Sequence, residues 1–379
     1  MGTLLPFITG TIWLYVLGRF VWPLPCGLGV RAALALVLFL VAQYHWFTSR
    51  FFGSLASPEL PQGVLVFLGW AFGAFLLLAM LVLLRDVAGG LIFLFARGAG
   101  RAILGGRVLH VSLGVLALVL AAIGTWQAIR VPDVKTVEIR IPGLPPAFDG
   151  YRIAQLTDLH ASRLLPASWM AAVVAKTNAL GADLIVITGD LADGSPEARA
   201  ADVRPLHDLQ APDGVLAIPG NHEYYADYQR WMLAYRALGL DMLENAHMLI
   251  RRGDAVLALA GITDRQAGPF GQLRPDLDAA LQGVAPGVPV ILLAHRPEGA
   301  VRHAQAGVAL QLSGHTHGGQ ILGPHLLTQW ANEGFVSGLY RVGAMHLYVS
   351  NGTGLWNGLA IRLGRPSEIT RIVLRPEVP

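Results

Sequence analysis

The chain has 379 residues, of which 54% are hydrophobic and 14% charged, with a formal net charge of +3. Such a composition excludes a purely soluble enzyme, because too little polar side chain remains to cover its surface. Residues 1–130 hold eight arginines and two acidic residues, which leaves 20 of the 28 basic and 23 of the 25 acidic residues in the remainder. The basic excess therefore belongs to the apolar half, and this favours contact with anionic lipid over binding of nucleic acid.

Four apolar segments account for the hydrophobic excess: residues 4–21, 32–47, 64–84 and 108–129. The last two are long enough to cross a bilayer, which takes about 20 residues. The second spans only if it extends from Arg31 to Phe52, with its arginines reaching toward the interface. Tryptophans lie near segment ends, as in the aromatic belts of membrane proteins (Trp22, Trp46, Trp126). We expect an all-α transmembrane region of about four helices over residues 1–130, and buried helices of a large soluble core are the alternative.

Arginines predict the topology of this region. The connection between the third and fourth segments carries four arginines against Asp86, so the positive-inside rule places it in the cytoplasm (Arg85, Arg97, Arg101, Arg107). Four spans then put both termini and the C-terminal part outside the cytoplasm. No basic stretch precedes the first apolar segment, which predicts an uncleaved anchor. Within the connection, the short apolar run 91–95 predicts an interfacial helix, with a re-entrant loop as the alternative.

The C-terminal part has the pattern of an α/β domain. Residues 131–149 combine prolines with an alternating apolar pattern, which predicts a linker merging into an edge strand. From residue 150, we expect strands at 151–157, 184–188, 215–218, 255–260, 288–293, 308–312, 335–336, 346–349 and 369–374, and helices at 167–179, 196–210 and 227–238. This order predicts two packed mixed β-sheets flanked by helices, forming one domain over 150–379.

Polar residues follow five of these strands. They are Asp158 and His160, then Asp190, then Asn221 and His222, then His295, and last the heptad Gly314–Gln320 with His315 and His317. Singly, each has an ordinary role: an aspartate caps a helix, an asparagine forms a turn, and a loop histidine is solvated. Five coincidences at one sheet edge instead favour a metal site. Carboxylate, imidazole and amide ligands without cysteine suit Mn, Fe, Zn or Co.

The last motif places two imidazoles one residue apart among glycines. On extended backbone, side chains two residues apart point the same way, so both rings would face one point.

Taken in order, Asp-x-His, Gly-Asp, Gly-Asn-His-Glu, His and Gly-His-Thr-His-Gly-Gly-Gln resemble the calcineurin-like metallophosphoesterase superfamily over about residues 150–371. The tail around 337–340 and 348–352 is similar to the bacterial membrane-associated branch, whose members often carry N-terminal membrane segments. The resemblance implies a metallophosphoesterase sandwich, with residues 150–379 as its catalytic domain, in a bacterial cell membrane. The arginine pattern described above predicts that this domain lies on the extracytoplasmic side.

The resemblance also implies roles for individual residues. Two divalent ions are expected, with Mn favoured: one would be held by Asp158, His160 and His317, the other by Asn221, His295 and His315, and Asp190 would bridge both. His222 would act as general acid or as donor to phosphoryl oxygens, with a spacer as the alternative. Glu223 would cap the following helix or orient a ligand. Gly318 and Gly319 would let the backbone approach the site closely.

These expectations lead to one functional hypothesis with alternatives. The chain would be a membrane-anchored phosphohydrolase that cleaves a phosphodiester or pyrophosphate through metal-activated water. Its partners would be a phosphorylated small molecule or lipid-linked substrate and membrane lipid, without nucleic acid. The alternatives are spans that only tether the enzyme, a phosphomonoesterase, and a non-catalytic metal or phosphate sensor or transporter.

Overall fold

The computed structural model describes residues 4–377 and divides the chain into two units. The helical unit runs to Ala128 and also includes Asn357–Leu363. The second unit, here called the catalytic unit because it contains the expected catalytic domain, comprises Ile129–Trp356 and the chain from Gly364 onward. The sequence did not indicate that Asn357–Leu363 groups with the distant N-terminal helices. Residues 1–3 and 378–379, to which the predicted sidedness of the termini refers, lie outside the described residues.

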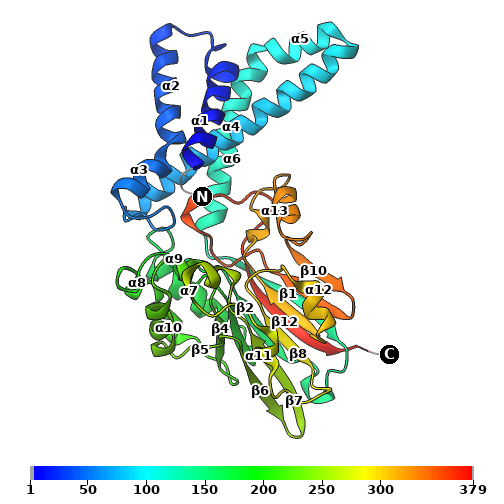
Figure 1. The fold of residues 1–379 in the computed structure, drawn as a ribbon. Coiled ribbons are helices and arrows are strands. Elements are labelled where there is room, and N and C mark those ends of the chain that lie inside the picture. Colours follow the sequence, from blue (N-terminus) through cyan, green and yellow to red (C-terminus); the bar gives the residue numbers. More distant parts are fainter. Residues whose placement is uncertain (1–3, 378–379) are drawn as a thin grey trace. The chain divides into compact units, whose positions relative to one another are not determined.

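The helical unit, blue to cyan in Figure 1, contains α1 (Leu5–Val16), the π-helical turn η1 (Leu17–Val21), α2 (Leu28–Ala42), α3 (Tyr44–Phe51), α4 (Gln62–Phe95), α5 (Arg97–Gly105) and α6 (Arg107–Ile129). Within the described residues, α4 and α6 are long and apolar enough to cross a membrane. A third candidate is the pair α2 and α3, bent by 52°. Two or three of the four expected spans therefore meet this criterion among the described residues, whereas α1 with η1 is too short to meet it.

The helix predicted at 91–95 is not a separate one. These residues form the last turns of α4, since no proline interrupts that helix over its 34 residues. The separate short helix is α5, which packs back against α4. A side chain at Gly100 would lie 2.5 Å from Phe93 Cα, so glycine permits this close contact.

Polar side chains within the helical unit bind one another. Arg85 is buried, donates to Asp86 Oδ1 at 2.7 Å and lies 2.9 Å from His110 Nδ1. Gln43 donates through Nε2 to the carbonyl oxygen of Pro6 at 3.1 Å. These partners give Arg85, His110 and Gln43 structural roles, which weighs against a transport pathway built from them.

The segment Asn357–Leu363 occupies a glycine-lined groove on α4 and α6. It begins with the 3₁₀ turn η6 (Asn357–Leu359), and the N–H of Arg362 donates to the carbonyl oxygen of Gly124 at 2.9 Å. A Cβ added at Gly69 would lie 2.9 Å from Ala360 Cβ, and one at Gly124 would overlap Ile361. The glycines thus leave the space that this segment fills.

The catalytic unit contains the two mixed sheets predicted from the sequence. The first sheet has the order β1 (Asp133–Ile141), β12 (Glu368–Pro376), β2 (Arg152–Leu156), β3 (Leu184–Thr188), β4 (Val215–Ile218), β5 (Asp241–Met242). The second has the order β10 (Gly338–Val342), β11 (Met345–Val349), β9 (Leu310–Ser313), β8 (Val290–Leu293), β7 (Ala255–Gly261), β6 (Ala246–Arg252). The edge strand expected before residue 149 is β1, which pairs in parallel with β12. β5, β6 and β10 were not predicted, and residues 335–336 do not form the expected strand.

The hydrophobic core lies between the two sheets. It joins side chains such as Ile153 and Val186 of the first sheet to Leu259, Ile291 and Leu312 of the second, all fully buried. Such burial on two faces explains why β3 and β8 are uninterrupted apolar runs in the sequence.

Helices flank the sandwich (Figure 1). They are η2 (Pro146–Phe148), α7 (Ala167–Asn178), α8 (Pro196–Val203), η3 (Arg204–Asp208), α9 (His222–Tyr225), α10 (Tyr228–Ala237), η4 (Arg265–Phe270), α11 (Leu277–Leu281), α12 (Ala300–Gln305), η5 (His317–Gly319) and α13 (His325–Ala331). The helix expected over 196–210 ends early at Val203, where Pro205 helps convert the chain to a 3₁₀ turn. α9 and α11–α13 are too short to have shown a clear helical period.

Candidate metal centre

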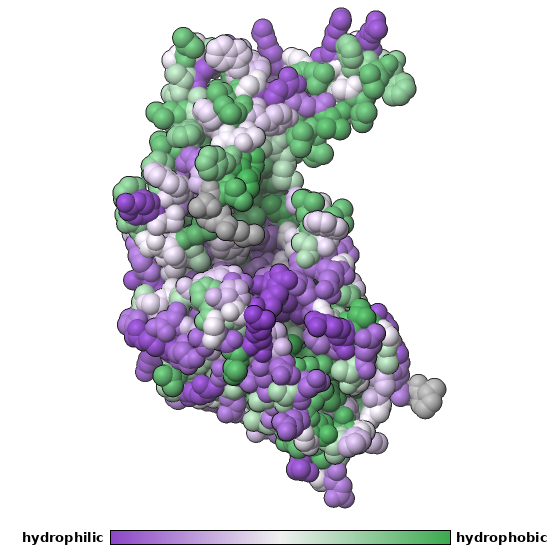
Figure 2. Space-filling view, in the orientation of Figure 1, coloured by the Kyte–Doolittle hydropathy of each residue, from purple (hydrophilic) through white to green (hydrophobic). Residues whose placement is uncertain are grey.

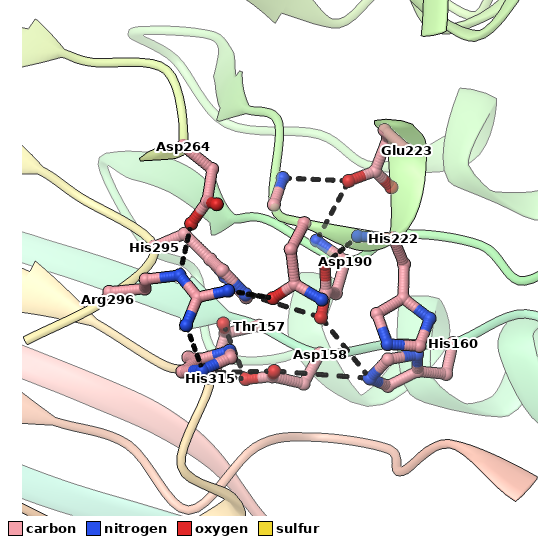
Figure 3. A network of polar contacts seen from close by, with 12 residues as sticks. Thr157, Asp158, His160, Asp190, His222, Glu223, Asp264, His295, Arg296 and His315 are labelled. Atoms are coloured by element: carbon pink, nitrogen blue, oxygen red, sulfur yellow. Dashed lines mark hydrogen bonds and ion pairs between the residues drawn. The ribbon is translucent and has the colours of Figure 1, made fainter. Parts of the chain in front are cut away.

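The strand order brings the predicted site residues to one edge. β2, β3 and β4 run parallel, as do β8 and β9, so the carboxyl ends of each set lie together. Hydrogen bonds link the following loops: the N–H of Asp158 donates to Gly189 O at 3.0 Å, and that of His160 to Asp190 O at 3.0 Å. In the second sheet, the N–H of Gly314 donates to His295 O at 2.9 Å. Figure 3 shows the resulting cluster.

Asp158, His160 and His317 form one group of buried ligand atoms within 4.8 Å of one another. Asp158 Oδ1 lies 3.5 Å from His317 Nε2 and 4.0 Å from His160 Nε2. Burial raises the pKa of Asp158 because it disfavours the charged carboxylate, and a bound cation would offset this cost of burying the charge. One carboxylate and two imidazoles converging in this way form a suitable partial coordination shell for a divalent transition metal.

Asp190, His295 and His315 form a second such group. Asn221 joins it, because its Oδ1 lies 3.2 Å from His295 Nε2. Asp190 Oδ2 is 3.2 Å from His295 Nε2 and 3.7 Å from His160 Nε2. The carboxylate of Asp190 therefore stands between the two groups.

The two histidines of the heptad do not face one point. His315 belongs to the second group and His317 to the first. Their φ angles are 68° and 49°, so the backbone is left-handed and the extended geometry expected from the sequence does not apply. Asp158, His160 and Asp190 share this left-handed conformation, with φ of 52°, 46° and 54°. Non-glycine residues in this strained region often cluster at functional sites.

An unsatisfied atom indicates that the first group fits a cation. His160 Nε2 is fully buried and has no hydrogen-bond partner among the described residues. Its other nitrogen, Nδ1, is held by Asp193 Oδ1 at 3.1 Å. This is the usual arrangement of a metal-binding histidine, in which one nitrogen is oriented by a carboxylate and the other faces the ion.

Asp193, which the sequence reasoning missed, connects His160 to His222. Its Oδ1 also lies 2.6 Å from His222 Nδ1. Burial alone would raise the pKa of Asp193, but the two neighbouring histidines outweigh it and lower the value to about 2. Burial likewise opposes the charge on His222, but Asp190 and Asp193 outweigh it and raise its pKa to about 9. The only indication of this role in the sequence is that Asp193 lies three residues after Asp190, in the loop that follows β3.

Glu223 organises the loops that carry the site. Its carboxylate accepts hydrogen bonds from the backbone N–H groups of Gly220 at 2.7 Å and Leu191 at 2.8 Å. Tyr235 donates to it through its hydroxyl at 3.2 Å. Glu223 is thus buried between the loops after β3 and β4, and its structural role is to hold these loops together.

Arg296 and Asp264 extend the cluster and were also missed. Arg296 donates through Nη2 to Asn221 Oδ1 at 3.1 Å, and its Nη1 lies 2.6 Å from His315 Nε2. Asp264 accepts from Arg296 Nε at 2.7 Å and so fixes the guanidinium (Figure 3). The signal was an arginine directly after His295.

Gly220, rather than the expected Gly318 and Gly319, lets the backbone approach the site closely. A Cβ at Gly318 would overlap Asn351, and one at Gly319 would lie 2.5 Å from His325 Cα, so these two accommodate neighbouring loops. A Cβ at Gly220, in contrast, would overlap Asp190 Oδ1. The glycine directly before Asn221 is therefore required by the geometry of Asp190.

Comparison with known proteins gives the same assignment as the motifs. Residues 151–319 match the family model of the calcineurin-like phosphoesterases. A zebrafish (Danio rerio) transmembrane protein with metallophosphoesterase domain is 32% identical over 92% of this chain and 91% of its own length. A cattle (Bos taurus) protein of the same description is 36% identical over 69% of this chain and 61% of its own length.

A bacterial relative, the uncharacterized metallophosphoesterase YkuE of Bacillus subtilis, is 32% identical over 61% of this chain and 82% of its own length. The relatives thus include vertebrate as well as bacterial proteins. The two animal relatives are named as transmembrane proteins, in agreement with the apolar helices α4 and α6. The chain therefore belongs to the calcineurin-like phosphoesterase family and is a metal-dependent phosphoesterase.

Proposed function

We propose that this chain is a membrane-anchored phosphoesterase with a dinuclear metal centre. The position of Asp190 Oδ2, 3.7 Å from His160 Nε2 and 3.2 Å from His295 Nε2, is the observation that carries the proposal. One ion would be held by Asp158, His160 and His317, the other by Asn221, His295 and His315, and Asp190 would be shared. Two divalent ions, with Mn favoured among Mn, Fe, Zn and Co, would supply Lewis acidity and lower the pKa of a water nucleophile toward 7.

His222 is the proposed proton donor of this site. Its Nδ1 is engaged by Asp193 at 2.6 Å, which leaves Nε2 as the atom that meets the substrate. The buried carboxylate of Asp193 stabilises the imidazolium form. His222 can therefore pass a proton from Nε2 to the leaving oxygen, or donate a hydrogen bond to a phosphoryl oxygen.

Arg296 is proposed to bind the anionic part of the substrate. Its guanidinium is fixed by Asp264 beside the second ligand group, and arginine suits phosphoryl oxygens because its planar fork donates two parallel hydrogen bonds. His295, Arg296 and Asp264 also line a cavity of about 640 Å³ in the catalytic unit. This space accommodates a substituent carried by the reacting phosphate, and the assays below separate the proposed phosphodiester or pyrophosphate from a monoester.

The apolar helices support a membrane setting for this reaction. We propose a multi-pass protein of a bacterial cell membrane with its catalytic domain on the extracytoplasmic side, because Arg97 and Arg101 lie in the connection between α4 and α6 and Arg107 begins α6. The substrate would be amphiphilic or lipid-linked, whereas spans that only tether the enzyme are the alternative. A reporter fused after residue 379 that is active only in the cytoplasm would overturn this sidedness.

Hydrolysis assays test the catalytic proposal. The purified full chain with Mn²⁺ is expected to hydrolyse bis-p-nitrophenyl phosphate faster than p-nitrophenyl phosphate. Asp190→Asn is expected to abolish both activities, whereas Asp254→Asn, on an exposed turn between β6 and β7, retains them. A chain that binds metal and phosphate but turns over neither ester would instead be a sensor, and a preference for the monoester would replace the diesterase assignment.

A further inference from the structure

An uncharged, apolar projection follows the last histidine of the metal centre. Gly318–Asn332 contains no Asp, Glu, Lys or Arg in fifteen residues. Within it lie four large apolar side chains, here called the α13 knuckle: Leu322, Leu326, Leu327 and Trp330. Leu326 and Trp330 are one helical turn apart and therefore lie on the same side of α13.

The knuckle is exposed throughout. The exposed fractions are 62% for Leu322, 59% for Leu326, 73% for Leu327 and 84% for Trp330. No residue of α13 is buried, although a surface helix usually buries one face. Figure 2 shows hydrophobic surface at the position that α13 has in Figure 1. Single exposed leucines are ordinary, but four large apolar side chains within nine residues form a patch that indicates an interaction site.

The projection is built into the domain rather than loosely attached. The N–H of His325 donates to Ile321 O at 3.0 Å, and that of Gly323 to His325 Nδ1 at 2.9 Å. Gln329 donates through Nε2 to Gly334 O at 2.9 Å, which closes the other end. At its base, Gly319 is packed so closely that a Cβ would lie 2.5 Å from His325 Cα. The knuckle is therefore fixed to η5, the turn that begins with His317.

The chain itself indicates what covers this surface. Only three residues, Arg130–Pro132, separate the end of α6 from the start of β1, a link that reaches about 14 Å when extended. A bilayer that holds α6 is therefore permanently available to the catalytic unit at high effective concentration. An uncharged sequence, with a tryptophan as the most exposed of its four large apolar side chains, is typical of segments that lie in the membrane interface.

We propose that the α13 knuckle inserts its four apolar side chains into the interfacial layer of the lipid bilayer. Its occupant is lipid, not a second copy of the chain or another protein. Because η5 joins the knuckle to His317, insertion holds that part of the metal centre near the headgroup layer. The inference rests on the proposed membrane anchoring and is independent of the catalytic assignment.

Site-directed fluorescence tests the proposal on the full chain in liposomes. The single cysteine is removed as Cys26→Ser, and one new cysteine, Leu327→Cys, carries the environment-sensitive dye NBD. The matched control is Leu233→Cys on α10 of the same unit, where the side chain is 67% exposed. Lipids with a nitroxide near the headgroup are expected to quench the dye at 327 at least threefold more than at 233. Equal quenching at the two positions would overturn the proposal.

A second arm separates lipid from protein as the occupant. In nanodiscs that hold one chain each, lipid insertion still gives blue-shifted emission and quenching at 327. Blue-shifted emission that appears only in crowded liposomes and resists lipid quenchers would show a protein contact and sink the lipid assignment. Hydrolysis of a soluble phosphodiester and thermal unfolding equal to those of the Cys26→Ser parent confirm that the labelled variants are folded.

Discussion

Replacing Asp193 by asparagine tests how the centre is held in position. Asp193 Oδ1 engages both His160 Nδ1, at 3.1 Å, and His222 Nδ1, at 2.6 Å, whereas Oδ2 has no partner among the described residues. An asparagine can therefore keep its oxygen between the two imidazoles and turn its amide nitrogen to the position of Oδ2. The substitution removes the charge while preserving the shape of the side chain.

The structure gives the size of the expected effect. Hydrogen bonds to charged groups contribute about 1.5–3 kcal/mol and neutral ones about 0.5–1.5 kcal/mol, so each bond loses about 1 to 1.5 kcal/mol. On the side of His222 this corresponds to a kcat about 5- to 13-fold lower. On the side of His160 it corresponds to binding of one of the two ions that is about 5- to 13-fold weaker, which reaches only the lower end of the 10- to 100-fold range typical of groups that orient metal ligands. Asp193→Ala, which removes both bonds, is expected to lose more of each.

Two measurements separate the two effects. Steady-state hydrolysis of bis-p-nitrophenyl phosphate at saturating Mn²⁺ reports the effect through His222, and metal content after dialysis reports the effect through His160. The double variant Asp193→Asn with His222→Asn is expected to be scarcely slower than His222→Asn alone at saturating metal, since Asp193 then has no proton donor to orient. Asp254→Asn serves as the control for altered charge. Unchanged kcat and metal content in Asp193→Asn, with unchanged thermal unfolding, would refute this reasoning.

Three further predictions concern other parts of the catalytic unit. His315→Ala and His317→Ala are each expected to retain about one ion per chain by elemental analysis, because each variant loses a ligand of a different group. Titration with a competing metal is expected to differ between the two variants, since the site that remains differs. Identical titrations would contradict the separate groups. In Gly220→Ala the added methyl group would overlap Asp190 Oδ1, so the carboxylate of Asp190 must move. Metal content and activity are therefore expected to fall at least about tenfold. Unchanged metal content would show that the loop can move aside. Leu293 lies in the core between the sheets, and Leu293→Ala is expected to lower the free energy of unfolding of the catalytic unit by about 2–5 kcal/mol. Urea titrations measure this loss, and the metal stoichiometry is expected to stay unchanged. A loss below about 1 kcal/mol would contradict the tight packing of Leu293.

The sequence was most informative where one local pattern determined the structure. The runs that became β3 and β4 are apolar except for Thr188, and a glycine or proline follows each of them directly. Both strands were predicted to the residue. The motifs after these strands predicted which residues converge, because parallel strands in one sheet end at the same edge.

Other features depend on contacts that no local pattern contains. His315 and His317 belong to different ligand groups because the backbone at both residues is left-handed, which the residue pattern alone did not predict. Asp193 and Arg296 are ordinary polar residues in sequence and gain their roles only through His222 and Asn221 across the site. The two-residue strand β5 is too short to show alternation.

The groove on α4 and α6 that receives Asn357–Leu363 has a consequence for how the protein is made. More than 230 residues separate Gly124 from Asn357. At a translation rate of about 5–20 residues per second, the segment that fills the groove is synthesised about 10 to 50 s after the helices. During that interval the contacts at Gly69 and Gly124 are missing, and the helical unit is incomplete although all its helices have been synthesised. A chain that stops at residue 356 would contain every candidate span and every proposed metal ligand, yet its helical unit would remain open. The helical unit can therefore be completed only after the catalytic unit has been translated nearly to its end.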